Sequence, residues 1–399
     1  MMKGLRDVVI VAYGRSAVAR AGKGSLSHTH PIEYSAQVLR GVLERVPRLE
    51  PGLIDDVILG CAKPELTQRY NIGRLVALRA QLPYSVPGQT VNRFCASSLQ
   101  AVSTGANMIR TGEADVIVAG GVESMTDIPY MGIGNPEFRD AWLDENEPGA
   151  YVGMGITAEN VAARYGITRK EMEAFAVDSH QKAARARQAG RLAEDIIPVT
   201  AAAEDGTLFT FDQDECIRPN STPEALEKLK PCFREDGVVT AAVSSPTNDG
   251  ASMVILMAAE KAAELGIRPI ARYLGYAVTG VDPNYMGIGP ISAVRRVMEL
   301  TGLTVEQMDV VELNEAFASQ SLACIRELKL DMGRVNPNGG AIALGHPLGA
   351  TGGILVSKAL SQLRRSGGTY ALVSMCIGGG MGAAAVLEAC HEAAGTEGA

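Results

Sequence analysis

One pattern of helix, strand and turn signals occurs twice in this chain of 399 residues. Each copy opens at a Pro-Ile pair with apolar residues at helical spacing and continues into a short apolar strand. A Val-Asn pair, a helix rich in small residues and a second strand follow. The matched segments are 31–45 and 290–300, 56–60 and 309–313, 96–110 and 350–365, and 115–119 and 369–374. The repeat predicts two similar halves in tandem.

Strands that alternate with helices of this length are typical of parallel sheets covered by helices. We therefore predict an α/β protein in which the two halves pack into a five-layered α/β/α/β/α body. The predicted first half comprises residues 1–120 together with 249–268, and the second comprises 269–399. Residues 121–248 form an inserted segment rich in charges and turns, with one amphipathic helix over 169–188. An insertion this long is usually functional, often as a lid or binding loop.

Composition excludes several classes of function. Lysine and arginine number 37 against 45 aspartates and glutamates, and this net charge of −8 argues against a nucleic-acid partner. The seven cysteines are an odd number without a C-x-x-C pair, so we expect no disulfide framework, no metal site and a reducing, cytoplasmic setting. Residues 371–389 are apolar enough for a membrane span, but their glycines favour strand, turn and strand instead.

Cys95 is the first candidate catalytic residue. It lies between a strand-like entry and the helix of the first copy, in Val-Asn-Arg-Phe-Cys-Ala-Ser-Ser. The positive end of a helix dipole and its unpaired N–H groups favour a thiolate, so we expect a lowered pKa. A buried structural cysteine is the alternative interpretation of this residue alone.

His346 lies at the corresponding place in the second copy, within a glycine-dense loop that also precedes a helix. The pseudo-symmetry of two halves can bring it opposite Cys95, and a cysteine with a histidine is the minimum for an activated thiol nucleophile. The alternative is a histidine in a surface loop, although Gly-His-Pro among glycines is poor material for packing.

Two further candidates follow strands of the second copy. Cys376 ends one strand before Gly378-Gly379-Gly380, where open α/β sheets bind ligands and glycine N–H groups can hold an oxyanion. Asn314 follows the strand that ends at Leu313. A core cysteine before a tight turn and an asparagine N-cap are the structural alternatives.

Together these residues resemble the thiolase family. The resemblance runs from the first strand to about Glu388, nearly the whole chain. The matching motifs are Val91–Gln100, Asn248–Gly250, Met286–Pro290, Asn314–Ala318, Gly339–Gly353 and Ser374–Gly382. Four of these motifs, namely Val91–Gln100, Asn314–Ala318, Gly339–Gly353 and Ser374–Gly382, carry a nucleophile, a base and an acid in order and are highly specific. The resemblance implies the duplicated thiolase-like fold with an inserted loop domain.

The resemblance implies a role for each candidate. Cys95 becomes acylated, His346 accepts its proton, and Cys376 moves the proton at the α-carbon of acetyl-CoA. Asn314, through a water, and His346 stabilise the thioester enolate. The backbone N–H groups of Cys95 and Gly378 hold the oxyanion during acyl transfer.

The resemblance also implies acyl-CoA and coenzyme A as ligands. Coenzyme A is a co-substrate, and no cofactor is expected to be bound permanently. It should lie along the inserted segment, where Arg218 and Ser245 match coenzyme-binding positions; a solvated charge and a turn residue are their alternatives. Family dimers and tetramers imply a homodimer or homotetramer.

Details favour the branch of the family that degrades 3-ketoacyl-CoA in fatty-acid β-oxidation. Arg93, residues 348–351 and Met286–Pro290 look like that branch, and Gly153 stands where biosynthetic acetoacetyl-CoA thiolases usually carry histidine. The glycine triplet 378–380 is more usual in the biosynthetic branch, which stays open. A decarboxylating ketoacyl synthase would need a second catalytic histidine. Intact Cys95, His346 and Cys376 argue against a non-catalytic lipid-binding relative.

Overall fold

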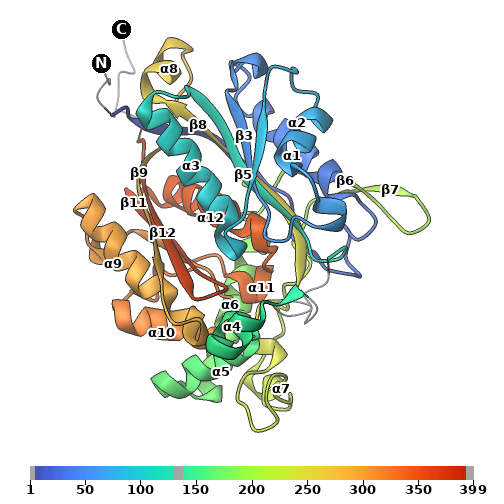
Figure 1. The fold of residues 1–399 in the computed structure, drawn as a ribbon, viewed down its shortest axis with the longest axis vertical. Helices are drawn as coiled ribbons and strands as arrows, with labels where there is room; N and C mark the ends of the chain where they lie inside the picture. The colour runs from blue at the N-terminus through green and yellow to red at the C-terminus, as the bar shows by residue number, and fades with distance from the viewer. Residues whose placement is uncertain (1–4, 129–137, 392–399) are drawn as a thin grey trace.

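The computed structural model describes residues 5–128 and 138–391 of the chain. Its first half contains β1 (Val8–Arg15), β2 (Ala19–Arg20), α1 (Pro31–Glu44), β3 (Asp56–Gly60), α2 (Ile72–Arg79), β4 (Gly88–Val91), α3 (Ser97–Thr111), β5 (Val116–Ser124), β8 (Asn248–Ala258) and α8 (Ala259–Glu264). Its second half contains β9 (Ala271–Gly280), α9 (Gly289–Thr301), β10 (Val310–Leu313), α10 (Ala318–Leu328), α11 (Ala341–Leu344), α12 (Thr351–Ser366), β11 (Tyr370–Ile377) and β12 (Met381–Ala389). The predicted paired helices and strands are confirmed, with shifts of a few residues at their ends (Figure 1).

The strands of both halves follow one order. In the first half the order is β4-β3-β5-β8-β1, and in the second it is β10-β11-β12-β9. The β1–β9 junction, Val9 with Arg272 and Ile10 with Ala271, joins the two halves edge to edge. In the second half an isolated parallel bridge joins Val335 to Val311 of β10, in the place where β4 pairs with β3 in the first half.

The sheets are mixed, so the expectation of parallel sheets is wrong in part. In the first half β3 pairs parallel with β4 and β5, but β8 runs antiparallel to β5 and β1. In the second half β10 and β11 are parallel, whereas β12 is antiparallel to β11 and β9. The reason is local for β12: a turn of three glycines at 378–380 is too short for anything but a hairpin.

Two helices lie between the sheets of the two halves. These are α3 and α12, which contact each other and pack on strands of both sheets (Figure 1). A Cβ atom at Gly352 would lie 2.4 Å from the backbone nitrogen of Leu99, so the two helices touch with their backbones. Helices α1 and α2 cover the outer face of the first sheet, and α9 covers that of the second. Buried side chains of α10 belong to the same core cluster as those of α9, β10, β11 and β12. This is the predicted five-layered arrangement.

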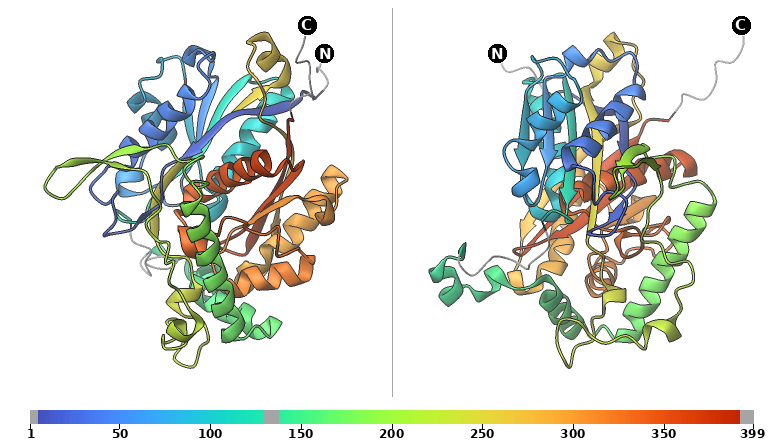
Figure 2. Two further views of the ribbon diagram at one scale, coloured as in Figure 1. Left: turned by 180° about the vertical axis from the view of Figure 1, so that it is seen from behind. Right: turned by 90° about the vertical axis from the view of Figure 1, so that its right-hand side faces the viewer.

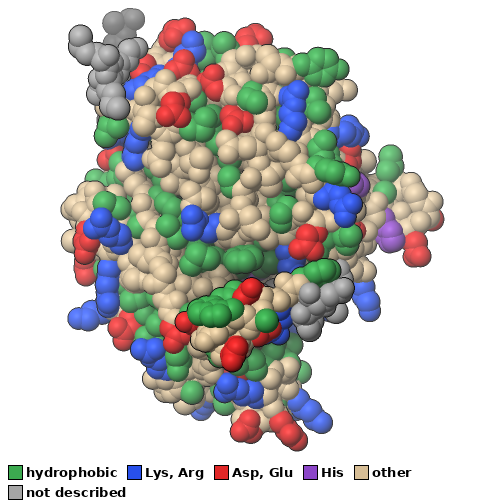
Figure 3. All heavy atoms as spheres, in the orientation of Figure 1, with side chains coloured by type: hydrophobic (Ala, Val, Ile, Leu, Met, Phe, Trp, Pro, Cys, Tyr) green, Lys and Arg blue, Asp and Glu red, His purple; other side chains and the backbone are tan. Residues whose placement is uncertain are grey.

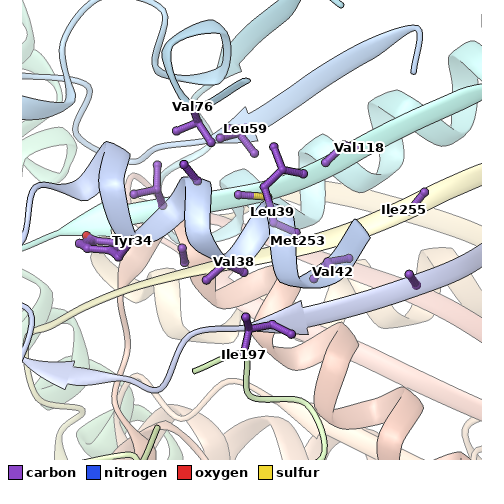
Figure 4. Close-up of a cluster of buried hydrophobic side chains, with 14 of the residues drawn as sticks. Tyr34, Val38, Leu39, Val42, Leu59, Val76, Val118, Ile197, Met253 and Ile255 are labelled. Atoms are coloured by element: carbon purple, nitrogen blue, oxygen red, sulfur yellow. The ribbon is translucent and has the colours of Figure 1, made fainter. Parts of the chain in front are cut away.

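The outer layer of the first half shows why the helical spacing predicts the packing. Tyr34, Val38 and Val42 repeat at intervals of four, and Leu39 adjoins them, so α1 buries one apolar stripe. Figure 4 shows this stripe facing side chains of β3, β5 and β8. Full burial stabilises such side chains by about 1.5–3 kcal/mol each.

The helices of the inserted segment lie at one end of the body, beneath the sheets in Figure 1, whereas its hairpin projects to the right beside the first half. It contains α4 (Ala141–Asn146), α5 (Met154–Tyr165), α6 (Arg169–Gln188), the hairpin β6 (Val199–Ala202) and β7 (Leu208–Phe211), and α7 (Pro223–Leu226). The predicted helix 169–188 coincides with α6, which begins at a Thr168–Glu171 capping box. Helix α4 projects from the body (Figure 2).

No helix within the described residues is long and apolar enough to cross a membrane. Residues 371–389 form β11, the glycine turn and β12, as predicted. On the face in Figure 3, side chains of both charge signs are interspersed rather than gathered into one basic area.

Candidate functional site

Cys95 lies in a short 3-10 turn, Phe94–Ala96, that leads directly into α3. Phe94 has a φ of +45°, a left-handed conformation that a phenylalanine seldom adopts. The Ser97 hydroxyl holds this turn, because it accepts from the Arg93 N–H at 2.9 Å and donates to the Phe94 carbonyl at 2.7 Å. The strained backbone therefore presents a half-buried cysteine at the head of the helix.

The expected lowering of the Cys95 pKa is wrong. Burial raises the pKa of this thiol to about 11, although N–H groups of Gly378 and of Cys95 itself oppose the rise. The free energy needed to remove a thiolate from water is larger here than the stabilisation that the N–H groups at the helix terminus give to it. At neutral pH the resting group is a thiol, and the Gly378 N–H points at its sulfur.

The turn that carries Gly378 also positions Cys376. Gly379 and Gly380 have φ values of +80° and +81°, so the reversal needs residues without a Cβ atom. Cys376 is fully buried, and burial raises its pKa well above the ordinary value. The Cys95 sulfur acts in the same direction, and the turn that carries Cys95 contacts β11, the strand of Cys376.

Asn314 and His346 form a second pair. The Asn314 side-chain nitrogen lies 3.3 Å from His346 Nε2, and His346 Nδ1 lies 2.7 Å from the Thr351 hydroxyl. Since that hydroxyl donates to the Pro347 carbonyl at 2.8 Å, it accepts from Nδ1. This assigns the proton to Nδ1 and leaves the Nε2 lone pair facing Asn314.

His346 is ready to accept a proton at neutral pH. Burial lowers its pKa to about 4, so the imidazole is neutral. Its backbone N–H donates to Asn248 Oδ1 at 2.8 Å, and Asn248 donates in turn to the Ala19 carbonyl at 2.9 Å. Gly345, at a φ of +110°, lets the loop approach this amide, since a Cβ there would lie 2.6 Å from the Asn248 side chain.

The two groups of residues meet at the carboxyl ends of β10 and β11. The Asn314 N–H donates to the Ser374 carbonyl at 2.9 Å, which puts Asn314 beside the strand that carries Cys376. The 3-10 turn of Cys95 packs on the end of β11 and on residues Leu348–Ala350, just after His346. The structure thus gathers Cys95, Cys376, Gly378, Asn314 and His346 at one place between the halves. Their chemical roles stay predictions.

The proposed coenzyme residues lie on the inserted segment. Arg218 is exposed, its backbone N–H donates to His180 Nδ1 at 3.1 Å, and both residues line a cavity of about 130 Å³. Ser245 is half-buried, and its N–H donates to the Ala316 carbonyl at 2.9 Å. The same cavity is lined by the neighbours of Ser245, Ser244 and Pro246. Coenzyme binding by Arg218 and Ser245 stays a prediction.

Sequence reasoning assigned no role to several residues that hold the site. Asn248 and Thr351 position His346, and both lie in segments that the sequence had marked as motifs. Glu123 is nearly fully buried and carried no recognisable signal. Its carboxylate accepts N–H groups of Ala62 at 2.8 Å and of Gly349 at 2.7 Å, so it ties the first half to the histidine loop. Within residues 5–128 and 138–391 no group of three or more metal-ligating side chains could hold a metal ion.

Comparisons with known proteins agree with this geometry. The family model for the thiolase N-terminal domain matches residues 8–260, and that for the thiolase C-terminal domain matches 267–389. A 3-ketoacyl-CoA thiolase of Bacillus subtilis is 46% identical over 97% of this chain and 100% of its own length. A beta-ketoadipyl-CoA thiolase of Escherichia coli is 44% identical over 96% and 100%. The crystal structure of the Bacillus anthracis acetyl-CoA acetyltransferase is similar with a TM-score of 0.89, at 39% identity over 97% and 100% of the two chains.

Proposed function

The chain belongs to the thiolase family, and on that basis we propose that it cleaves 3-ketoacyl-CoA with coenzyme A into acetyl-CoA and a shortened acyl-CoA. The observation that carries the proposal is the convergence at one site of a cysteine, a neutral histidine, a second cysteine and a backbone N–H. Each of these groups has a task in breaking a carbon–carbon bond next to a thioester.

The first step forms an acyl-enzyme. The Cys95 sulfur attacks the 3-keto carbon of the substrate while its proton passes to His346 Nε2. Because the pKa of the thiol is about 11 and that of the imidazole about 4, no ion pair forms at rest. Proton transfer therefore accompanies the attack. The N–H groups of Cys95 and Gly378 stabilise the oxyanion that develops on the keto oxygen.

The second step breaks the bond between C2 and C3. The electron pair stays on the acetyl-CoA fragment as an enolate, which Asn314 and His346 stabilise by hydrogen bonding. The Cys376 thiol protonates C2 and recovers a proton from His346, so the site returns to neutral. The raised pKa of Cys376 suits an acid that must remain protonated until an enolate forms.

Coenzyme A completes the cycle. Its thiol loses a proton to His346 and attacks the acyl group on Cys95, and the cysteine leaves with that proton. Arg218 would receive the phosphates of the coenzyme and Ser245 its pantetheine arm, since both lie on the inserted segment and Ser245 donates to Ala316 in the loop that follows Asn314. The protein would work as a homodimer or homotetramer, as the family resemblance implies.

Residues around the glycine turn support an acyl chain longer than that of acetoacetyl-CoA. Gly153 precedes α5, and among the described residues a Cβ there would meet only Ile156, at 3.9 Å. The sulfur of Met154 lies 3.5 Å from the Cβ position of Gly378. Phe94 lies 3.9 Å from that of Gly379. An apolar wall beside the cysteine favours an alkyl group over a polar one.

Condensation of two acetyl-CoA molecules is the second candidate, because the same groups run the reaction backwards. Its supporting observation is the glycine triplet 378–380 of the turn. A non-catalytic lipid-binding role is the third candidate. It does not require an imidazole oriented by hydrogen bonds as that of His346 is.

The deciding experiment measures thiolysis rates over 3-ketoacyl-CoA substrates of increasing chain length. We expect kcat/KM to be higher for medium or long chains than for acetoacetyl-CoA. A preference for acetoacetyl-CoA alone would favour the biosynthetic alternative, and no turnover of any chain length would favour the non-catalytic one. The variant Gly153→His narrows the space before α5 and should shift the preference towards the short substrate.

A further inference from the structure

The side chains of Asn314 and His346 come from two different loops. Asn314 begins the loop between β10 and α10, whereas His346 lies in the histidine loop, residues 338–349, which contains α11. Their side-chain nitrogens are 3.3 Å apart. Glu315 follows Asn314 in the chain and is only 2% exposed. A carboxylate buried to this degree needs hydrogen-bond donors, and it finds them on the other loop.

The Glu315 carboxylate accepts hydrogen bonds from three separate segments. Oε2 accepts from the backbone N–H of Ile342 in α11 at 3.2 Å and from the hydroxyl of Ser179 in α6 at 2.6 Å. Oε1 accepts from the Asn336 side chain at 2.8 Å. Asn336 is tied to β10, because its amide accepts from the Leu313 N–H at 2.9 Å and donates to the Leu313 carbonyl at 2.8 Å. One carboxylate therefore fixes α11 to the end of β10.

Ser179 extends this contact to the start of the histidine loop. Its hydroxyl accepts from the Gly340 N–H at 3.1 Å while it donates to Glu315. A Cβ atom at Gly340 would lie 2.1 Å from the carboxyl carbon of Glu315, and one at Gly339 would lie 2.7 Å from the Ser179 carbonyl oxygen. The loop approaches these two residues only because glycines occupy both positions. Helices α6 and α11 accordingly contact each other (Figure 1).

Helix α11 connects this contact to the imidazole. It is a single turn, and the Gly345 N–H closes it by donating to the Ala341 carbonyl at 2.8 Å. His346 follows directly, and its own N–H donates to Asn248 Oδ1 at 2.8 Å. Glu315 and Asn248 thus hold the two ends of the turn that carries His346, one from the second half and one from the first.

Glu315 acts on His346 through the loop and not by direct contact. Within the described residues its hydrogen bonds come from Ser179, Asn336 and Ile342, and none comes from the imidazole. A shift of α11 relative to β10 would change the distance between the Asn314 and His346 side chains. Misplacing a catalytic group by about 1 Å can lower a rate by about 10²-fold, so such a shift matters for turnover.

We propose that Glu315 is a positioning residue, whose carboxylate fixes α11 against the end of β10 and so sets the distance between Asn314 and His346. The inference rests on the proposed thiolysis, in which these two side chains stabilise the enolate and His346 moves the proton.

Glu315→Met tests the proposal, because it keeps the length of the side chain and removes both acceptor oxygens. We expect kcat for thiolysis to fall about 30-fold, with the KM values for 3-ketoacyl-CoA and coenzyme A within about threefold of the wild type. Glu315→Gln keeps one acceptor oxygen and should lose less than about tenfold. Ser179→Ala removes one of the three donors and should lower kcat about fivefold.

A double-mutant cycle separates positioning of His346 from a general loss of structure. In a His346→Ala background, Glu315→Met should change kcat by less than about threefold, because the group that it positions is absent. The control Glu159→Met removes another buried carboxylate, which accepts from the N–H groups of Val238 at 3.0 Å and Val239 at 2.8 Å. Its effect on kcat should be the same in both backgrounds. An equal loss for Glu315→Met in both backgrounds would overturn the proposal.

Crystal structures of the wild type and of Glu315→Met test the inference without any measurement of activity. We expect the distance between Asn314 Nδ2 and His346 Nε2 to grow by about 1 Å in this variant and to stay the same in Glu159→Met. An unchanged distance in Glu315→Met would reject the positioning role. Absence of thiolysis by the wild-type chain would instead reject the proposed function, and the crystallographic distance would still decide whether Glu315 positions the two side chains. If Glu315→Met does not fold, Ser179→Ala takes its place in both measurements.

Discussion

Strands at corresponding positions in the two halves end in different polar residues. The matched strands β3 and β10 are followed by Cys61 and Asn314. On the neighbouring strands, Asp56 of β3 pairs with Ile117 of β5, and the Asp309 N–H before β10 donates to the Tyr370 carbonyl of β11. Glu123 lies six residues after Ile117, and Cys376 lies six residues after Tyr370, so these two residues also occupy corresponding positions. The first half places a cysteine and a glutamate where the second places an asparagine and a cysteine.

The two strand ends differ in how many of the hydrogen-bonding atoms of their polar side chains have partners. The Glu123 carboxylate accepts from the N–H groups of Ala62, Lys63 and Gly349 and from the Gln68 side chain. Asn314, in contrast, has a buried Oδ1 with no hydrogen-bond partner among the described residues. A carboxylate whose hydrogen-bonding capacity is filled stabilises the fold, whereas a buried oxygen without a hydrogen-bond partner is available to a substrate. The repeat thus keeps one strand end for structure and frees the other for chemistry.

The largest expected effect is that of replacing Cys95, the proposed nucleophile. Cys95→Ala should reduce thiolysis by about 10⁴-fold, because it removes the atom that carries the acyl group. Mass spectrometry after incubation with acetyl-CoA should find no acetylated residue in this variant. As a control, Cys61→Ala should keep acetylation of Cys95, and loss of that label in Cys61→Ala would contradict the assignment of Cys61 to structure.

Cys376→Ala should slow carbon–carbon cleavage by about 10³-fold, since no other thiol is assigned to protonate C2. Acetylation of Cys95 by acetyl-CoA needs only His346 and the oxyanion donors, so it should persist. A rapid-quench measurement separates the two steps. Equal loss of both would show that Cys376 supports Cys95 rather than acting on the enolate.

Glu123→Gln should lower the free energy of unfolding by about 3 kcal/mol, because an amide turns donors toward backbone N–H groups that lose their acceptor. Denaturant unfolding measures this change. The corresponding Cys376→Ala should cost only about 1 kcal/mol. Similar costs for the two variants would remove the distinction between the two strand ends.

Stability should also fall in acid through the buried histidines. The pKa values of His180 and His346 are lowered from 6.5 to about 4 in the folded chain. The unfolded chain therefore binds these protons first, and stability declines as the pH falls from about 6.5 to about 4. His180→Gln should remove about 2–3 kcal/mol of that decline, measured by unfolding at the two pH values. An unchanged slope would mean that His180 keeps its ordinary pKa.

The smallest expected effect is on the orientation of His346. Thr351→Val removes the acceptor of the Nδ1 proton and should lower kcat about tenfold with little change in KM. Thr351→Ser keeps the hydroxyl and should restore most of the rate. If the serine and valine variants had equal kcat, the hydroxyl would have no role in holding the ring.

Local patterns in the sequence predicted much of this fold. Apolar spacing located α1, α6 and α9 because a buried face repeats with the helical period. The glycines at 378–380 predicted the turn behind Cys376 because few other residues adopt its backbone. The direction of β8 was missed, since it depends on the path of the chain between Ser124, the end of β5, and Asn248, the start of β8, rather than on local signals.

The candidate site divides in the same way. Cys95, His346, Cys376 and Asn314 stand out as reactive or polar residues at the ends of predicted elements. The positions of Asn248 and Glu123 could not be assigned, because each holds a loop from a different part of the chain. The direction of the Cys95 pKa shift was wrong because desolvation depends on everything packed around the sulfur, including the glycine turn of the other half.

The order of helices and strands, the duplication and the identity of the reactive groups were determined by the amino-acid sequence alone, because they depend on neighbours within a few turns or strands. Tertiary structure decided which protonation states these groups adopt and which of two equivalent strand ends is left unsatisfied. Burial and long-range hydrogen bonds set both, and they exist only once the two halves have closed on each other.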